Sequence, residues 1–353
     1  MTSQLGDANR TAGEVAERLG DWLTGNGVQS DSGAFCAWRD EDGLLAFEYP
    51  EITGYALTWL AGRPSLTAAG QEAGRRAARW LVERLAAGNR AAHDGWDEGA
   101  VYTFDLGMIA AGMISYGRRF DEAQTVERGE LLAGELAKLA LTNPFMPAVA
   151  PDGPPTGRPS SWSTAGRPHL AKCVQALMLI EEWDAAAHLI ADACTFQDPS
   201  GYFLTQPDEQ IVMLHPHFYT VEALWMWGTA RGDDDALERA HRATEWAWRH
   251  QLPAGGLPRM VALDEDTVAP EQFDLTSQGV RAGLLTGAGL DRLEKAVSRL
   301  CTSALPLPDG AALPYQPQAE SLHQNSWVSL FGAQALELAA QPGEVSLAWH
   351  ELV

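Results

Sequence analysis

The feature that most constrains the fold is a regular alternation of two kinds of helical segment along the chain. One kind is apolar on almost every side, as in the segment that begins at Tyr49 and reads YPEITGYALTWLAG. The other kind has a single apolar stripe and many Arg and Glu residues, as in residues 233–251. A helix that is apolar all round is buried, whereas a striped helix covers a core. The sequence therefore predicts an inner and an outer layer of helices.

Segments of the buried type recur at spacings of about fifty residues, the period of helical-hairpin repeats. They begin near Tyr49, Val101, His169, His215, Gln272 and His323. Striped partners are expected at 67–87, 121–140, 182–197, 233–251 and 290–303, and a helix at 12–25 is a sixth partner that would close a ring. We expect an all-α fold, an (α/α)6 barrel, in one domain over residues 1–353. An open solenoid is the alternative, but it needs polar capping repeats, which the sequence does not show.

One stretch, residues 143–168, interrupts this pattern. Its proline and glycine residues forbid regular structure. Long loops inside compact domains are usually functional covers or disordered segments. Trp162 and Arg167 near its end suit a lid over a site, and a floppy insertion is the alternative.

Charge and composition exclude several classes of protein. The formal net charge of -22 argues against binding a nucleic-acid backbone, which needs clustered Lys and Arg. The longest apolar stretches fall short of the roughly 20 residues that cross a bilayer, and the first twenty residues lack the apolar core of a signal peptide. We therefore expect a cytoplasmic protein that binds neither membrane nor nucleic acid. Positive charge is almost all arginine, a usage typical of GC-rich bacterial genomes.

The cysteines carry no sign of a metal site. Cys36, Cys173, Cys194 and Cys301 are scattered without a CxxC pair, so we expect reduced thiols. His215 and His217 are spaced i, i+2 at a helix start and point in different directions, unlike the i, i+4 pair of helical zinc sites. We expect neither a metal nor another cofactor.

The unusual polar residues gather in the first turns of the predicted inner helices. All inner helices of such a ring run the same way, so their first turns line one mouth of a central cavity. The residues we expect to be catalytic are Glu51, Asp105, His217, Tyr219 and Asp274. Those we expect to bind substrate are Trp38, Tyr55, Tyr102, Lys172, His215, Glu222, Gln278, Arg281, His323, Asn325 and Trp327.

Single members of this set have structural explanations. Asp or Asn at a helix start is often a cap, and Glu51 or Asp274 could complement the helix dipole. Glu222 and Arg281 are harder to explain, because both lie two turns into helices that should be buried, where an unpaired charge is costly. Either these two side chains pair with each other across the lumen, or they face a cavity that binds a ligand.

Four motifs, in the same order, resemble those of bacterial (α/α)6 toroid proteins. Tyr49–Tyr55 resembles their YPE-x-TGY motif, and Phe104-Asp105-Leu106-Gly107 resembles an FD-x-G helix. A helix with His, Tyr and Glu is matched by His215 or His217 with Tyr219, Glu222 and Leu224, and an N-x-W helix by Asn325-Ser326-Trp327. Relatives on this scaffold, the six-hairpin glycosidase-like fold, resemble glucuronyl C5-epimerases, unsaturated glucuronyl hydrolases and acylglucosamine 2-epimerases. The resemblance covers about residues 36–338 and implies the toroid fold.

Three functions fit these residues. The first is an acid/base enzyme that hydrolyses, eliminates from or epimerises a small, polar, sugar-like substrate, because carboxyls face His, Tyr, Lys and Arg. The second is a tailoring enzyme of natural-product biosynthesis that closes a ring with loss of an anionic leaving group such as sulfate. The third is a toroid that binds a ligand without catalysis. The sequence gives no indication of a protein partner.

Overall fold

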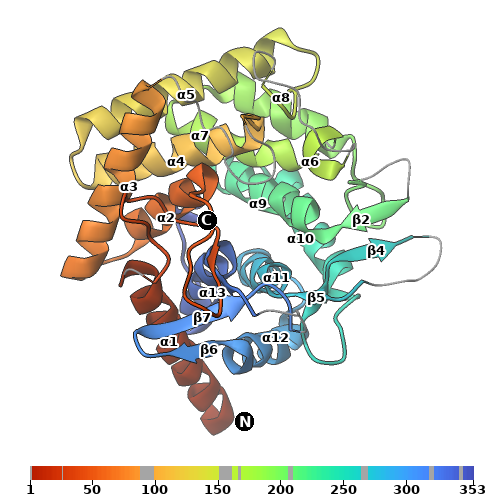
Figure 1. Ribbon diagram of the computed structural model, residues 1–353. Helices are drawn as coiled ribbons and strands as arrows, with labels where there is room; N and C mark the ends of the chain where they lie inside the picture. The colour runs from red at the N-terminus through yellow and green to blue at the C-terminus, as the bar shows by residue number, and fades with distance from the viewer. Residues whose placement is uncertain are drawn as a thin grey trace.

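The computed structural model describes residues 2–25, 27–87, 99–150, 161–165, 168–205, 210–263, 269–317, 322–341 and 345–353. In these parts of the chain, two layers of helices form a closed ring (Figure 1). The inner helices are α2 (Pro50–Gly62), α4 (Thr103–Arg119), η1 (Pro168–Cys173) continued by α7 (Val174–Leu179), α9 (Leu214–Arg231), α11 (Phe273–Thr286) and α13 (Ser326–Ala339). Each begins within a few residues of the predicted start.

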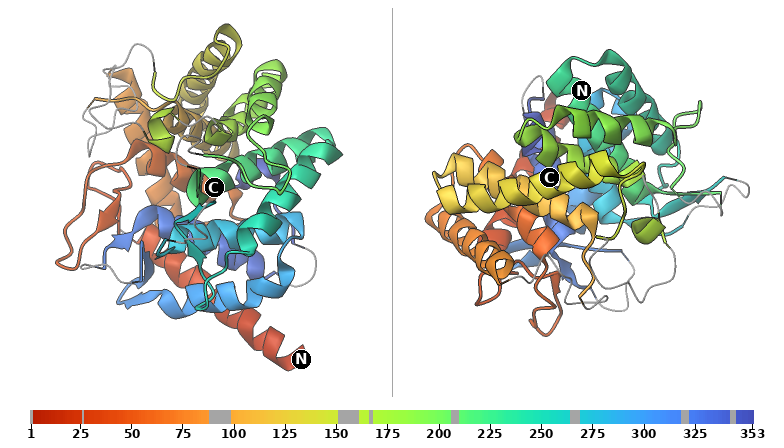
Figure 2. Two further views of the ribbon diagram at one scale, coloured as in Figure 1. Left: turned by 90° about the vertical axis from the view of Figure 1, so that its right-hand side faces the viewer. Right: turned by 90° about the horizontal axis from the view of Figure 1, so that it is seen from above.

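The outer layer also follows the prediction. It consists of α3 (Ala68–Ala86), α5 (Ala123–Thr142), α8 (Trp183–Cys194), α10 (Asp234–Trp248), α12 (Leu290–Ser303) and α1 (Thr2–Thr24). Helix α1 packs against α13 and α12, so the first outer helix closes the ring with the last hairpin (Figure 2). The (α/α)6 barrel is confirmed. Two details differ, since α1 begins at Thr2 and the third inner helix opens with a 3-10 turn.

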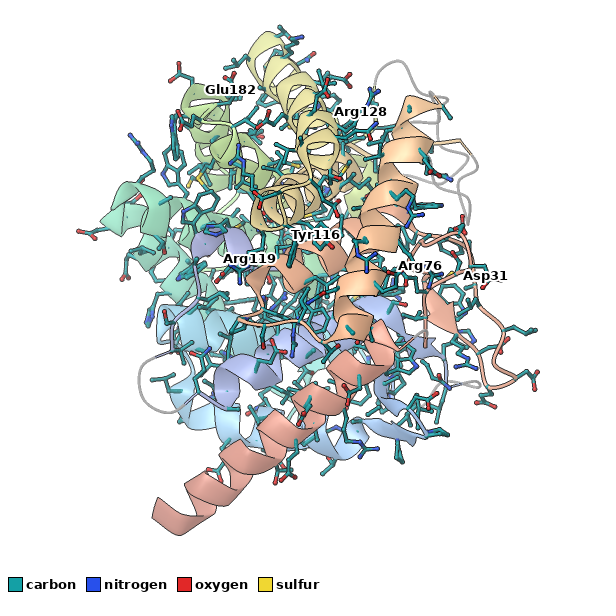
Figure 3. The ribbon with its side chains drawn as sticks, turned by 90° about the vertical axis from the view of Figure 1, so that its left-hand side faces the viewer. Asp31, Arg76, Tyr116, Arg119, Arg128 and Glu182 are labelled. Carbon is teal, nitrogen blue, oxygen red and sulfur yellow. The ribbon has the colours of Figure 1, made fainter. Side chains whose placement is uncertain are left out.

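The burial pattern explains why the two layers separate. Helix α2 buries all residues from Pro50 to Leu60, as expected for a helix that is apolar on every side. Helix α3 buries only its apolar stripe. Figure 3 shows the outer side of the ring, where Arg76 of α3 and Arg128 of α5 are partly exposed while Tyr116 of the inner helix α4 is buried. No described helix has the length and apolar character needed to span a membrane.

Short antiparallel strands, which the sequence did not predict, frame one end of the ring. The four-stranded sheet has the order β1 (Trp38–Arg39), β8 (Gln324–Asn325), β7 (Gly310–Pro314) and β6 (Leu305–Leu307). The two-stranded pairs are β2 (Ile211–Met213) with β4 (Met260–Ala262), and β3 (Leu257–Pro258) with β5 (Glu271–Gln272). Strands β2, β5 and β8 run directly into α9, α11 and α13. They fix the point at which each of these inner helices starts.

The opposite end of the ring is closed by the segment 345–353, which includes the 3-10 turn η3 (Trp349–Glu351). This turn packs on α2, α4, α7 and α9. Gln175 donates to the carbonyls of His350 and Leu352, and Gln334 donates to the carbonyl of Glu351. The lumen is therefore accessible from the end at which the inner helices start.

A repeated side-chain bracket joins the hairpins. A glutamine that follows an outer helix donates to the carbonyl of the glycine four residues later and to a carbonyl of the next outer helix. The glycines have φ between 108° and 118°, a conformation that other residues rarely adopt. The pairs are Gln29–Gly33, Gln197–Gly201 and Gln251–Gly255. The same two hydrogen bonds therefore recur in three of the hairpins.

Glycines also let α2 and α4 cross closely. A Cβ atom added at Gly112 would lie 2.1 Å from the carbonyl oxygen of Gly54, which cannot move without shifting the backbone of α2. We expect Gly112→Ala to lower the free energy of unfolding by roughly 2–3 kcal/mol through this overpacking. Urea unfolding followed by circular dichroism measures the loss. Gly134→Ala is the control, because a Cβ there meets nothing within 4 Å and should stabilise α5 slightly.

Candidate active site

The second residue of each described inner helix lines one cavity of about 220 Å³ at the open end of the lumen. Because these helices run the same way, their second residues lie at the same height. The residues are Glu51, Phe104, His169, His215, Asp274 and Trp327. The helix N-termini carry partial positive charge toward this space, which favours carboxylates and anionic ligands there. The predicted gathering of polar first turns around one pocket is therefore present.

Glu51 and Asp105 form a pair of carboxyls on neighbouring helices. Their residues are 7% and 6% exposed, and both line the cavity. Burial raises the pKa of both groups, and the charge of Glu51 raises the pKa of Asp105 further, to well above its ordinary value. The Tyr49 hydroxyl donates a hydrogen bond to Glu51, and this bond lowers the pKa of Glu51. One carboxyl of such a pair can hold a proton near neutral pH while the other is ionised.

A second acid/base group lies across the cavity on α9 and α11. His215 Nδ1 is 3.2 Å from Asp274 Oδ2, an ion-pair distance without the alignment of a hydrogen bond. The His215 ring packs edge-on against Tyr219, with ring centroids 4.4 Å apart. His169, next along the wall, is fully buried, and burial lowers its pKa to about 3, so its imidazole is neutral. This wall thus holds two imidazoles and one carboxyl.

Four buried polar atoms on the cavity wall have no hydrogen-bond partner among the described residues. They are Nδ1 of His169, Nδ1 of His215, Nε2 of Gln272 and Oδ1 of Asp274. A buried polar atom without a partner is costly, and such atoms are rare unless a ligand or water satisfies them. The cavity is therefore suited to a ligand that carries both donors and acceptors.

The remaining wall includes residues that the sequence did not single out as ligand contacts. Tyr315, which follows β7, packs against Trp327 with ring centroids 5.6 Å apart. Arg259, between β3 and β4, is the one Arg or Lys among the described residues that line the cavity. Its backbone N–H donates to the carbonyl of Pro270, and its carbonyl accepts from Leu214, so its position is fixed. Arg259 lies outside the helices, so the pattern of inner helices could not reveal it.

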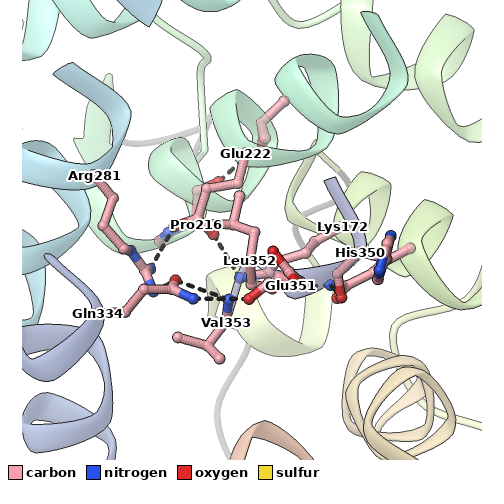
Figure 4. Close-up of polar contacts among 11 residues, drawn as sticks. Lys172, Pro216, Glu222, Arg281, Gln334, His350, Glu351, Leu352 and Val353 are labelled. Carbon is pink, nitrogen blue, oxygen red and sulfur yellow. Dashed lines mark hydrogen bonds and ion pairs between the residues drawn. The ribbon is translucent and has the colours of Figure 1, made fainter. Parts of the chain in front are cut away.

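Five predicted binding residues lie beneath the cavity rather than in it. Tyr55 and Gln278 occupy the sixth position of their helices, one layer below the lining. In the next layer, Lys172 Nζ lies 2.5 Å from Glu222 Oε2, and Arg281 Nη2 lies 2.6 Å from Glu222 Oε1 (Figure 4). Of the two readings for Glu222 and Arg281, pairing across the lumen is the one observed. Their side chains are 0–1% exposed, so they cannot contact a ligand.

His217 does not reach the cavity. Its Nδ1 accepts the N–H of Phe203, and its Nε2 lies 3.1 Å from the carbonyl of Ala243. The fourth residues of three other inner helices accept a backbone N–H in the same way, and these residues are Thr53, Thr276 and Ser329. The expected catalytic role of His217 is therefore corrected to a structural one, because both ring nitrogens are occupied by backbone groups.

This role predicts how His217 variants behave. We expect His217→Thr to retain turnover, because Thr occupies the equivalent position in α2 and α11, and to lose about 1–3 kcal/mol of unfolding free energy through one hydrogen bond and a small cavity. Burial lowers the pKa of His217 to about 4. Between pH 6.5 and 4 the unfolded chain binds a proton at this position that the folded chain does not, so folding stability falls as the pH falls.

Denaturant unfolding at several pH values checks this expectation. The stability advantage of the wild type over His217→Thr should shrink by about 1.4 kcal/mol per pH unit below 6.5. His215→Ala is the matched variant, and it should lose turnover while keeping the contribution of His217 to stability. Loss of turnover in well-folded His217→Thr would contradict the structural assignment.

Three other predicted contacts lie away from the cavity lining. Trp38 and His323 stack on each other, with centroids 5.1 Å apart and planes 6° from parallel. The Asn325 side chain accepts from the N–H of Val328 and caps α13. Each therefore has a structural partner in place of a ligand. In contrast, the predicted residues that do line the cavity are Glu51, Tyr102, Asp105, His215, Tyr219, Asp274 and Trp327.

The described part of the predicted lid reaches the cavity. Trp162 and Ser163 of the short helix α6 (Trp162–Ala165) line it. The Trp162 ring lies edge-on to His169, with centroids 5.2 Å apart, and 5.9 Å from His215. Residues 151–160 and 166–167, including Arg167, lie outside the described residues, so the reading of 143–168 as a lid stays a prediction. Within the described chain, no three His, Cys, Asp or Glu side chains are grouped as metal ligands.

Solved structures share this fold over nearly the whole chain. Cellobiose 2-epimerase from Bacillus thermoamylovorans B4167 matches with a TM-score of 0.70 and 12% identity, covering 96% of this chain and 100% of that one. An unsaturated glucuronyl hydrolase specific for heparin matches at 0.65 and 14%, covering 96% and 97%. The chain is a six-hairpin toroid. The α-1,6-mannanase GH76A of Salegentibacter sp. HEL1_6 also matches this toroid, at 0.64 and 15%, covering 92% and 98%.

At these identities the likeness establishes the fold alone. No protein-family model matches the sequence, and no curated protein sequence matches it. The chemistry of this toroid has to be argued from its own cavity.

Proposed function

We propose that the protein is an acid/base enzyme that acts on a small, polar, sugar-like substrate in the central cavity. The observation that carries the proposal is the presence of two proton-transfer groups in one space, the Glu51–Asp105 pair and His215 beside Asp274. The similar toroids include enzymes named as hydrolases and epimerases of sugars, which supports a carbohydrate substrate.

The geometry suggests which residues would transfer protons and which would bind the substrate. A protonated carboxyl of the Glu51–Asp105 pair would donate to an oxygen of the substrate, and His215 would accept a proton from the other side. The unpartnered His169 Nδ1 and Asp274 Oδ1 would bind hydroxyl groups, which are both donors and acceptors. Tyr219, Trp162 and Trp327 supply aromatic surface for a sugar ring. Hydrolysis, elimination and epimerisation all begin with such transfers.

The second candidate is ring closure with loss of an anionic leaving group. The observation that favours it is Arg259 at a rim otherwise rich in carboxyls. A carboxylate would take the proton of an attacking amine, and Arg259 with His215 would receive the departing anion. Lys172 and Arg281 cannot serve as the anion site, since Glu222 holds both below the cavity.

A substrate panel in D2O separates these functions. The purified protein is incubated with uronic-acid oligosaccharides, reducing disaccharides and N-acetylated sugars, and products are followed by NMR and mass spectrometry. Epimerisation would replace a carbon-bound hydrogen with deuterium, elimination would remove one and form a C=C bond, and hydrolysis would do neither. A sulfated amino alcohol tests the second candidate through release of sulfate. If no panel member turns over or binds, the sugar proposal is rejected.

A further inference from the structure

The buried cluster below the cavity carries more positive than negative charge. Lys172 and Arg281 both bind the single carboxylate of Glu222, and Arg281 Nη1 also lies 3.3 Å from Oε1 of Gln334 (Figure 4). Gln334 otherwise contacts backbone groups of the segment that closes the lumen. Among the described side chains, no second carboxylate lies at ion-pair distance from either cation. Two cations and one anion leave one positive charge without a partner within the cluster.

The ammonium group of Lys172 lies against aromatic rings beneath the cavity. Lys172 Nζ lies 5.0 Å from the ring centroid of Tyr55, 4.9 Å from that of Tyr219 and 5.8 Å from that of Phe331. Tyr219 itself lines the cavity floor. Water, which would screen the charge, does not reach Lys172, whose side chain is 0% exposed. Charges interact strongly across such a dry region.

The two cavity carboxyls, Glu51 and Asp105, have different neighbours, and the Lys172 charge acts on Glu51. Glu51 faces Lys172, His215 and the Tyr49 hydroxyl, and each of these favours its ionised form. Asp105 faces Glu51 and its own backbone N–H, and its carboxyl also lies near the buried thiol of Cys173. The repulsion between the two carboxyls acts on both alike. Glu51 differs because Lys172, His215 and the Tyr49 hydroxyl each stabilise its negative charge.

We infer that the excess positive charge of the Lys172–Glu222–Arg281 cluster divides the two cavity carboxyls into an ionised Glu51 and a protonated Asp105. Lys172 is then a positioning residue that acts through Glu51 and touches no substrate. If the proposed function holds, Asp105 is the carboxyl of the pair that donates the proton, opposite His215 as the base, and Glu51 stays ionised beside it. The inference itself concerns charge states, so it can be tested without a substrate.

Carboxyl 13C NMR titration of the full chain provides the test, with resonances assigned from Glu51→Gln and Asp105→Asn. In the wild type, Glu51 should titrate at lower pH than Asp105. Lys172→Met leaves a neutral Glu222–Arg281 pair, and it should move the Glu51 midpoint upward by about 0.5–1 pH unit. The double variant Lys172→Met with Glu222→Gln restores one positive charge through Arg281, and it should move the midpoint back toward the wild-type value.

Three results would overturn the inference. They are a wild type in which Asp105 ionises first, a folded Lys172→Met variant with unchanged midpoints, and a double variant that titrates like Lys172→Met. The first needs no cluster variant, so the test stands even if Lys172→Met does not fold. A protein with the expected titration but no turnover on any substrate would retain the inference and reject the proposed function.

Discussion

Asp105→Asn is expected to reduce turnover by about 10²–10⁴-fold, the usual contribution of a general acid. The amide is isosteric with the protonated carboxyl, so the cavity keeps its shape and its hydrogen-bonding surface while losing the proton that can be transferred. Substrate affinity should change little, and the loss should appear in kcat. The basic limb of the pH profile should vanish in the variant, because the raised pKa of Asp105 sets that limb.

The matched control is Asp235→Asn on the outer helix α10. Asp235 is 73% exposed and pairs with Arg239 one turn away, so its replacement should leave kcat within a factor of two. Steady-state kinetics of both variants on the substrate found in the panel, with near-ultraviolet circular dichroism to verify folding, decides the case. If Asp105→Asn keeps kcat and its basic limb, Asp105 is not the acid.

The sequence predicted the ring because the two helix classes differ in a property that burial imposes. Inner helices must be apolar on every side, as α2 is, and outer helices need only a stripe. The pairing of Glu222 with Arg281 was one of the two alternatives that the sequence predicted, because an unpaired buried charge is costly.

The roles of individual site residues could not be predicted from such a pattern. His215 and His217 are two residues apart, and a helix turns about 200° over that distance, so only one can face the lumen. Which one does so depends on where α9 begins, and that point is fixed by the pairing of β2 with β4. The strands are too short to leave a periodic pattern. Arg259 and Tyr315 lie next to these short strands, so no helical pattern pointed to them.

Removing the shared carboxylate should have the largest effect on stability. Glu222→Ala leaves Lys172 and Arg281 buried side by side with no anion, and breaking a buried ion pair in this way typically costs about 3–5 kcal/mol. The loss should be seen as a lower midpoint in urea, or as failure to accumulate folded protein. Lys172 can release its proton to relieve the repulsion, because burial already lowers its pKa to about 8. The destabilisation should therefore be smaller at pH 9 than at pH 7.

A charge-free cluster tests whether repulsion is the cause. The triple variant Lys172→Met, Glu222→Leu, Arg281→Met replaces the ions with apolar side chains of similar volume, and it should recover most of the stability lost in Glu222→Ala. It should also lose the influence of the cluster on Glu51, since no positive charge remains beneath Tyr55 and Tyr219. A triple variant as unstable as Glu222→Ala would mean that Glu222 supports the lumen by packing. Recovery of stability together with an upward shift of the Glu51 midpoint would show that the cluster is retained for its charge and that the fold does not require it.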